Sequence, residues 1–143
     1  MYLTDMKKLL LLLVTAFALP SCQNDQDDTL DLTALEGTWL LTEVLFDPGD
    51  GSGEFRKIDS ERQLILTPEN TYSANYDVCQ AIEEGENLSG SFDRIDAQEF
   101  LIPCAGSLLN SVQGRLEDGH LIVYYPCDEP CAYKFRKISD FRG

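Results

Sequence analysis

The sequence predicts an all-β domain built as an eight-stranded up-and-down antiparallel barrel. Three observations support this prediction. From Gly37 onward, short runs rich in β-branched and aromatic residues alternate with turn residues. No amphipathic helical stretch in this region exceeds about two turns. Long and short connections alternate along the chain, as they do when all long loops share one end of a barrel.

Each expected strand ends at a turn signal or a long polar segment. Residues 68–70 and the Asp96-Ala97 pair mark tight turns, and Asp118-Gly119 is a two-residue hairpin signal. The expected strands are residues 37–46, 54–66, 71–78, 88–95, 98–103, 112–117, 120–126 and 131–138.

The connections predict a cup with one closed end and one open mouth. Residues 47–53, 79–87 and 104–111 form the long connections. The tight turns between them would all lie at the opposite end. A two-sheet sandwich is the alternative, but its Greek-key crossings would place long loops at both ends.

The first segment is typical of an export signal. Lys7 and Lys8 precede an uncharged run from Leu9 to Leu19, which is too short to span a bilayer. The run ends in Leu19-Pro20-Ser21-Cys22, which resembles the lipobox of bacterial lipoproteins, although Pro20 departs from the usual small or β-branched residue. The resemblance implies that residues 1–21 are a lipoprotein signal peptide and that Cys22 is lipidated. A buried N-terminal helix is the alternative.

A short polar segment follows the predicted cleavage site. Residues 22–29 are polar and acidic, so they are expected to be a solvated tether ahead of a domain at residues 30–143. The lipobox resemblance implies a lipid-anchored location in the cell envelope, and the acidic residues after Cys22 resemble the surface-export signal of some Gram-negative lipoproteins. We therefore expect lipid anchoring to the outer membrane, at its periplasmic face or at the cell surface.

The start of the first strand carries a second resemblance. Thr33 and Glu36 fit a capping box, so residues 30–36 are expected to form one short helical turn. The following Gly37-Thr38-Trp39 resembles the Gly-x-Trp opening of lipocalins and their small bacterial lipocalin-like relatives. This resemblance implies that Trp39 plugs the closed end and that a basic residue, Arg136 or Lys137, packs over it. We assign Arg136 to barrel closure with Gly37 and Trp39; the second lipocalin signature is not evident.

Four cysteines follow the lipobox. Strand parity places Cys79, Cys104, Cys127 and Cys131 on the open rim. An even number of cysteines in an exported domain predicts disulfides, most simply Cys79 with Cys104 and Cys127 with Cys131, although spacing alone does not fix the pairing. A zinc site built from the four thiolates is the alternative.

Net charge restricts the partners. The chain has 11 Lys plus Arg against 25 Asp plus Glu, a formal charge of −14, which opposes nucleic-acid binding. Acidic loops at the mouth would also repel fatty acids and phosphorylated ligands. Neutral apolar ligands, cationic ligands or a basic protein partner are favoured. The acidic mouth residues are Asp47, Asp50, Glu54, Glu83, Glu84, Glu86, Asp128 and Glu129.

Alternation within strands predicts the barrel interior. Leu41, Glu43 and Leu45 are in phase with Trp39. A buried Glu43 would need a cation or a hydrogen-bond partner, unless a β-bulge turns it to solvent. Bulky aromatics make a filled core at least as plausible as a pocket. The candidate ligand-binding residues are Glu43, Tyr72, Tyr76, Phe100, Tyr133 and Phe135, and the other inward residues are Leu64, Leu66 and Ile102.

The sequence gives little support for a metal site or for catalysis. Oxygen-bearing residues in the first long loop allow a weak calcium hypothesis, although an acidic turn is the simpler interpretation. These residues are Asp47, Asp50, Ser52 and Glu54. The single histidine, His120, follows a hairpin turn, and no nucleophile elbow, phosphate loop or paired-histidine motif is present. We therefore expect no cofactor and no enzymatic activity.

These observations predict a monomeric, lipid-anchored binding module. It would carry or scavenge a small apolar or cationic ligand inside the barrel. The alternative is a protein-interaction or inhibitor module with a filled barrel, acting through the disulfide-tied acidic rim.

Overall fold

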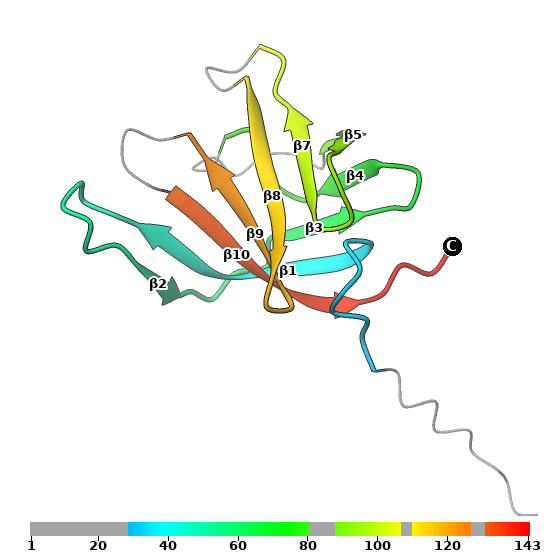
Figure 1. Ribbon diagram of the computed structural model, residues 1–143, viewed down its shortest axis with the longest axis horizontal. Coiled ribbons are helices and arrows are strands. Elements are labelled where there is room, and N and C mark those ends of the chain that lie inside the picture. Colours follow the sequence, from blue (N-terminus) through cyan, green and yellow to red (C-terminus); the bar gives the residue numbers. More distant parts are fainter. Residues whose placement is uncertain (1–28, 81–87, 107–109, 127–130) are drawn as a thin grey trace, which may run out of the picture.

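The computed structural model describes residues 29–80, 88–106, 110–126 and 131–143. These residues form ten antiparallel strands and no helix (Figure 1). The strands are β1 (Gly37–Phe46), β2 (Glu54–Lys57), β3 (Gln63–Leu66), β4 (Thr71–Ala74), β5 (Leu88–Ser91), β6 (Asp93–Arg94), β7 (Glu99–Pro103), β8 (Ser111–Glu117), β9 (His120–Tyr125) and β10 (Cys131–Ser139).

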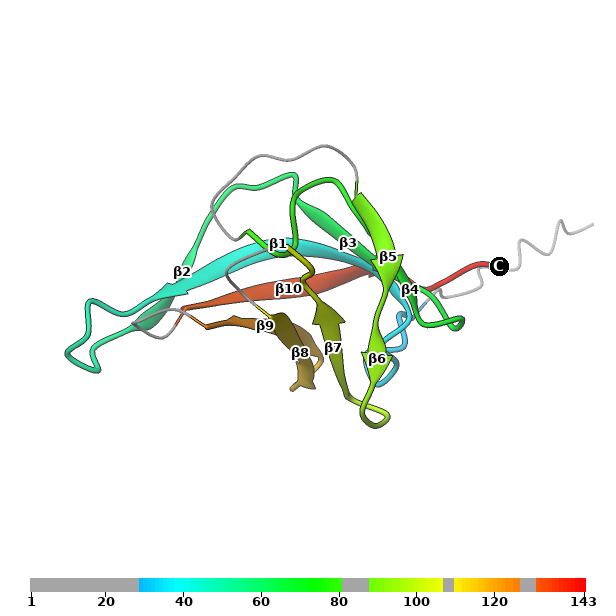
Figure 2. The same ribbon diagram turned by 90° about the horizontal axis from the view of Figure 1, so that it is seen from above.

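The strands belong to one sheet that closes almost completely on itself. The sheet order is β5-β4-β3-β1-β10-β9-β8-β7-β6, with β2 paired to β1 off this path. The two ends of the path, β5 and β6, are consecutive in the chain and flank Phe92. β5 pairs with β4 and β6 pairs with β7, so the continuous segment from β5 to β6 closes the barrel wall (Figure 2). The all-β barrel prediction is confirmed, and the sandwich alternative is wrong.

The strand count differs from the eight predicted. The predicted strand at 54–66 contains both β2 and β3, because residues 59–61 leave the ladder. Two hydrogen bonds with β1 flank this break. Ile58 N–H donates to Thr42 O before it, and Leu41 N–H of β1 donates to Arg62 O after it. The predicted strand at 88–95 contains β5 and β6.

Residues 30–36 form a turn instead of the predicted helical turn. The Asp31 carboxylate accepts a hydrogen bond from Thr33 N–H at 2.9 Å, which is an Asx-turn. The carbonyls of Asp31 and Ala34 accept hydrogen bonds from Lys137 Nζ at 2.5 and 2.9 Å. These side-chain contacts hold the segment across the end of the barrel, so no helix forms there.

Trp39 closes this end of the barrel as expected, but its cationic neighbour is not Arg136. Trp39 is fully buried and donates from Nε1 to Leu35 O at 2.8 Å. Lys137 is 1% exposed, and its Nζ lies 5.2 Å from the centroid of the Trp39 ring, whereas Arg136 is exposed. Inward and outward residues alternate along β10, and Lys137 follows Phe135 on the inward face. The assignment of Arg136 is therefore wrong.

Gly37 has no room for a side chain beside this closure. Its φ is +140°, and an added Cβ would lie 2.5 Å from Ser139 O and 2.8 Å from Lys137 Cε. Glycine is thus required both by the backbone conformation and by the close approach of β10.

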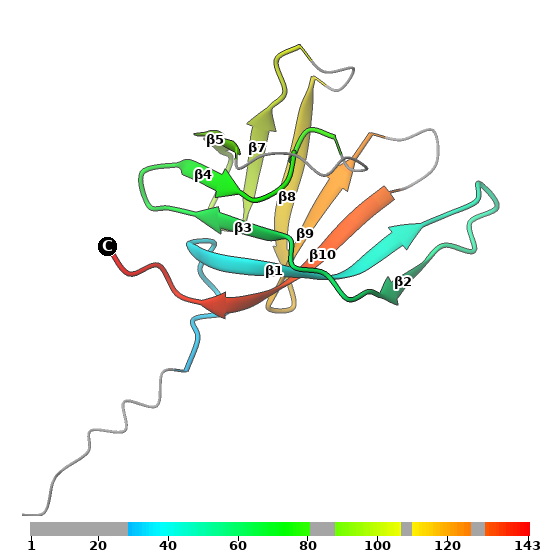
Figure 3. The same ribbon diagram turned by 180° about the vertical axis from the view of Figure 1, so that it is seen from behind.

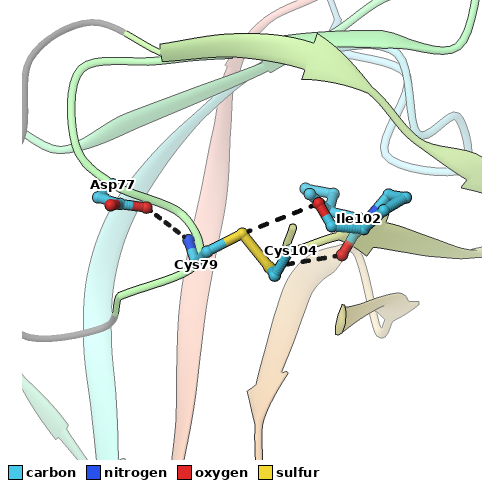
Figure 4. Close-up of a disulfide and its surroundings, with 5 residues drawn as sticks. Asp77, Cys79, Ile102 and Cys104 are labelled. Carbon is cyan, nitrogen blue, oxygen red and sulfur yellow. Dashed lines mark hydrogen bonds between the residues drawn. A yellow bond between two sulfur atoms is a disulfide. The ribbon is translucent and has the colours of Figure 1, made fainter. Parts of the chain in front are cut away.

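The other end of the barrel carries the predicted disulfide. Cys79 and Cys104 are bonded to each other, and Cys79 N–H donates to the Asp77 carboxylate at 2.9 Å (Figure 4). This bond excludes the four-thiolate zinc hypothesis. Cys131 is also disulfide-bonded, while Cys127, its predicted partner, lies outside the described residues.

The barrel interior around Phe100 is filled by side chains. Phe100 is fully buried and tilts against Phe92 with ring centroids 5.1 Å apart. Gly114 makes space for the Phe100 ring, because a Cβ there would overlap the ring. Leu41, Leu64, Leu66, Ile102 and Phe135 are buried in the same core, as the alternation predicts.

Candidate binding site at the side of the barrel mouth

An opening occurs where the second predicted strand is interrupted. Here the end of β1 and β2 form an arm that projects away from the rest of the barrel (Figure 1). The chain joining β2 to β3 runs along the base of this arm (Figure 3). A cleft of about 590 Å³ lies there. It is lined by Leu41, Val44, residues 58–62, Asn75 and Tyr76.

A β-bulge in β1 sets the shape of the cleft. The pairing of β1 with β10 shifts register between Leu41 and Glu43. Beyond the shift, Val44 packs toward the core, while Glu43 pairs with Lys134 through an ion pair of 3.5 Å. A one-residue insertion exchanges the two faces of a strand. The predicted inward positions of Glu43 and Leu45 are therefore corrected, and the bulge that was the alternative for Glu43 is observed.

The Asn75 side chain forms hydrogen bonds with the backbone at the edge of the cleft. Its Nδ2 donates to Glu61 O at 2.8 Å, and its Oδ1 accepts from Gln63 N–H at 2.6 Å. Arg62 N–H donates to Ser60 Oγ at 3.1 Å. These bonds satisfy backbone groups that leave the β-ladder, so the segment 58–62 has a defined conformation.

Three tyrosines and Arg62 gather where the cleft meets the barrel interior. The rings of Tyr125 and Tyr133 meet edge to face, with centroids 4.9 Å apart. Arg62 Nη1 donates to the Tyr133 hydroxyl at 3.2 Å, and Arg62 Cζ lies 5.8 Å from the centroid of the Tyr76 ring. Phe135 forms the floor, with its ring centroid 6.4 Å from those of Tyr76 and Tyr133.

Two hydroxyls of this cluster are buried and make no well-formed hydrogen bond with any residue that the structure describes. They belong to Tyr76, which is 1% exposed, and to Tyr125, which is 5% exposed. Burial raises the pKa of each phenol, and the neighbouring phenols raise the pKa of Tyr125 further. Both hydroxyls are therefore protonated at neutral pH and able to donate.

The predicted site residues fall into three places. Tyr76, Tyr133 and Phe135 belong to the tyrosine cluster, whereas Phe100 lies in the filled core. Tyr72 is half-buried against that core, and its ring covers Gly90. Glu43 lies outside the barrel in its ion pair with Lys134.

Sequence reasoning missed Tyr125, Arg62 and Asn75. Tyr125 is in phase with the buried Leu121 and Val123 of β9, so alternation along that strand could have identified it. Arg62 and Asn75 had no such signal, because their positions depend on the break between β2 and β3.

The first long loop adopts the acidic turn that was the simpler interpretation. Asp47 Oδ1 accepts hydrogen bonds from Gly49 N–H at 2.9 Å and Gly51 N–H at 3.1 Å. Asp50 Oδ1 accepts from Ser52 N–H at 2.9 Å, and hydrogen bonds from the hydroxyl and then the N–H of Ser52 hold the pKa of Asp50 below its usual value. No group of three His, Cys, Asp or Glu residues within the described ranges could hold a metal ion.

His120 lies at the start of β9 near the closed end. Its Nδ1 is 3.1 Å from Asp118 O, within the turn that joins β8 to β9. This contact accounts for the histidine as part of the hairpin.

No protein-family model and no curated protein sequence match the chain. Within the described part of the chain, no helix is long and apolar enough to cross a membrane.

Proposed function

We propose that the protein is a non-enzymatic, lipid-anchored module of the cell envelope that binds a small molecule in the cleft between the segment 58–62 and Tyr76. One observation carries this proposal: Tyr76 lines the cleft, and its buried hydroxyl, like that of the neighbouring Tyr125, has no well-formed hydrogen bond among the described residues. An unpaired buried polar group costs free energy, and sites that tolerate this cost are often functional.

The size and lining of the cleft fit a small ligand. Its volume of about 590 Å³ lies within the usual range for small-molecule sites. Leu41, Val44 and Ile58 give it an apolar side, while Asp59 and Glu61 add two acidic groups against the single cation of Arg62. This acidic excess disfavours anionic ligands, in agreement with the charge of the whole chain.

The cleft proposal is tested with Nile red, an uncharged apolar dye. We expect saturable fluorescence enhancement with the wild type, and binding about tenfold weaker in Ile58→Trp, a loss of about 1.4 kcal/mol. Ile58 is 38% exposed and lines the cleft, so a larger side chain there fills the opening without entering the core.

Ile95→Trp is the matched control for this experiment. Ile95 is 52% exposed and lies just after β6, away from the cleft. We expect it to leave dye affinity unchanged. Absence of saturable binding to the wild type, or equal losses in both variants, would contradict the proposed site.

Membrane anchoring is proposed through Cys22, which lies outside the described residues. The support is the lipobox-like Leu19-Pro20-Ser21-Cys22 after a short apolar run. We expect the full chain, expressed in a Gram-negative bacterium, to incorporate radiolabelled palmitate and to enter the membrane fraction, and Cys22→Ser to do neither. Label retained in Cys22→Ser would show that the anchor is wrongly assigned.

A protein-interaction module is the second candidate, because two observations favour it. The barrel interior around Phe100 is filled by side chains, and Phe46 at the end of β1 is 65% exposed on the projecting arm. A large exposed aromatic side chain is common in contact surfaces. A protein-interaction module does not need a ligand in the cleft. Saturable binding of Nile red in the cleft therefore favours the first candidate, and its absence favours the second.

A further inference from the structure

We infer that Tyr76 and Tyr125 form a hydrogen-bonding subsite for an uncharged ligand that carries an oxygen acceptor, such as a carbonyl, on an apolar body. This inference rests on the proposed function and specifies the chemistry of its ligand.

The two hydroxyls require an acceptor. Each phenol has one O–H donor, and neither makes a well-formed hydrogen bond among the described residues. The two hydroxyls neighbour each other, and even when Tyr125 donates to the Tyr76 oxygen, the Tyr76 proton still lacks an acceptor. The Tyr133 hydroxyl already receives a hydrogen bond from Arg62, and the Arg62 guanidinium itself can only donate. A carbonyl oxygen has two lone pairs, so it can accept from one hydroxyl or from both.

The surroundings select an uncharged molecule. Burial of an unpaired charge costs free energy, and the rings of Phe135 and Tyr133 surround the two hydroxyls. A carboxylate would also pass Asp59 and Glu61, which line the cleft. An ammonium group supplies donors but no acceptor, so it leaves the protons of both phenols unpaired.

Arg62 forms the boundary between the cleft and this subsite. Its side chain lines the cleft, lies over the Tyr76 ring and donates a hydrogen bond to the Tyr133 hydroxyl. A ligand therefore places its apolar body against Leu41 and Val44 and its acceptor past Arg62, toward the two hydroxyls.

The test uses four naphthalenes that share one ring system. They are 2-acetylnaphthalene, 2-ethylnaphthalene, 2-naphthoate and protonated 2-(aminomethyl)naphthalene, each titrated against the Nile red complex of the full domain. We expect the ketone to bind about fivefold more tightly than the ethyl compound, the ratio for one net hydrogen bond. We expect the two ions to bind more weakly than the ketone.

Removing the hydroxyls provides the decisive comparison. In Tyr76→Phe/Tyr125→Phe the preference for the ketone should fall to about one, with the ethyl compound bound at least as well as before. The double variant removes both hydroxyls together and leaves neither one unpaired beside the other, so it should fold with unchanged or higher stability. Tyr124→Phe is the matched control, because the Tyr124 hydroxyl lies outside the barrel and donates to Glu117 at 3.0 Å.

The outcomes separate this inference from the proposed function. Equal affinity for ketone and ethyl compound in the wild type, an unchanged preference in the double variant, or tightest binding of either ion would overturn the inference alone. Failure of all four naphthalenes and Nile red to bind would contradict the proposed function and the inference together.

Discussion

Lys137→Ala is expected to lower the free energy of unfolding by about 3 kcal/mol, whereas Arg136→Ala should change it by less than about 0.5 kcal/mol. The Lys137 ammonium donates to two backbone carbonyls, pairs with Asp140 at 3.0 Å and lies over the Trp39 ring. Hydrogen bonds to charged groups contribute about 1.5–3 kcal/mol each, and a desolvated cation–π contact contributes up to about 2 kcal/mol. Desolvation of the ammonium offsets much of this sum.

Urea unfolding followed by tryptophan fluorescence measures both variants directly. The chain has a single tryptophan, Trp39, which lies against the ammonium in question. Lys137→Met retains an apolar side chain of similar length and separates lost charge from lost packing; we expect it to recover only part of the stability. A larger loss in Arg136→Ala than in Lys137→Ala would contradict this account of the closed end.

Asp140 makes the closed end sensitive to acid. Its pKa is lowered, chiefly by the hydrogen bond to Lys137 and then by the backbone N–H of Asp31. A lowered folded-state pKa contributes stability that is present above the unfolded value near 3.8 and is lost as pH falls through the folded value. The charge pairing at this end therefore operates at neutral pH.

The sequence predicted those features that depend on period-two alternation and chain parity. Trp39 is buried at the closed end, and parity brings Cys79 and Cys104 to the same rim, where they are bonded. Alternation could also have decided between Arg136 and Lys137, because Lys137 follows the inward Phe135 by two residues, but Arg136 was assigned instead. The resemblance to lipocalins implied only that one of these two basic residues packs over Trp39, and it did not distinguish between them.

The binding cleft was not predictable in the same way. A single bulge between Leu41 and Glu43 exchanges the faces of the rest of β1, and no residue in that stretch signals its position. The break at residues 59–61 brings Arg62 beside Tyr76 and Tyr133 through contacts between distant segments. Local sequence patterns describe strands, whereas this site lies where two strands depart from their pattern.

The Cys79–Cys104 disulfide links stability to the proposed binding site. Cys79→Ser/Cys104→Ser is expected to lower the free energy of unfolding by about 3 kcal/mol, because the bond closes a loop with a sequence separation of 25 residues. Cys104 is 4% exposed, so a serine hydroxyl placed there adds a cost of burial. The double variant is preferable to chemical reduction, because a reductant would also cleave the disulfide of Cys131.

The same variant should weaken Nile red binding while the domain is still folded. Tyr76 precedes Cys79 by three residues, and Asn75 and Tyr76 lie just beyond the end of β4, so the disulfide anchors the segment that forms one wall of the cleft. Without it, ordering this wall on binding costs conformational entropy that the oxidised protein has already lost on folding. Dye titration at a urea concentration well below the unfolding transition measures this effect. Unchanged dye affinity together with the expected loss of stability would show that the cleft is held by β1 and the segment 58–62 alone.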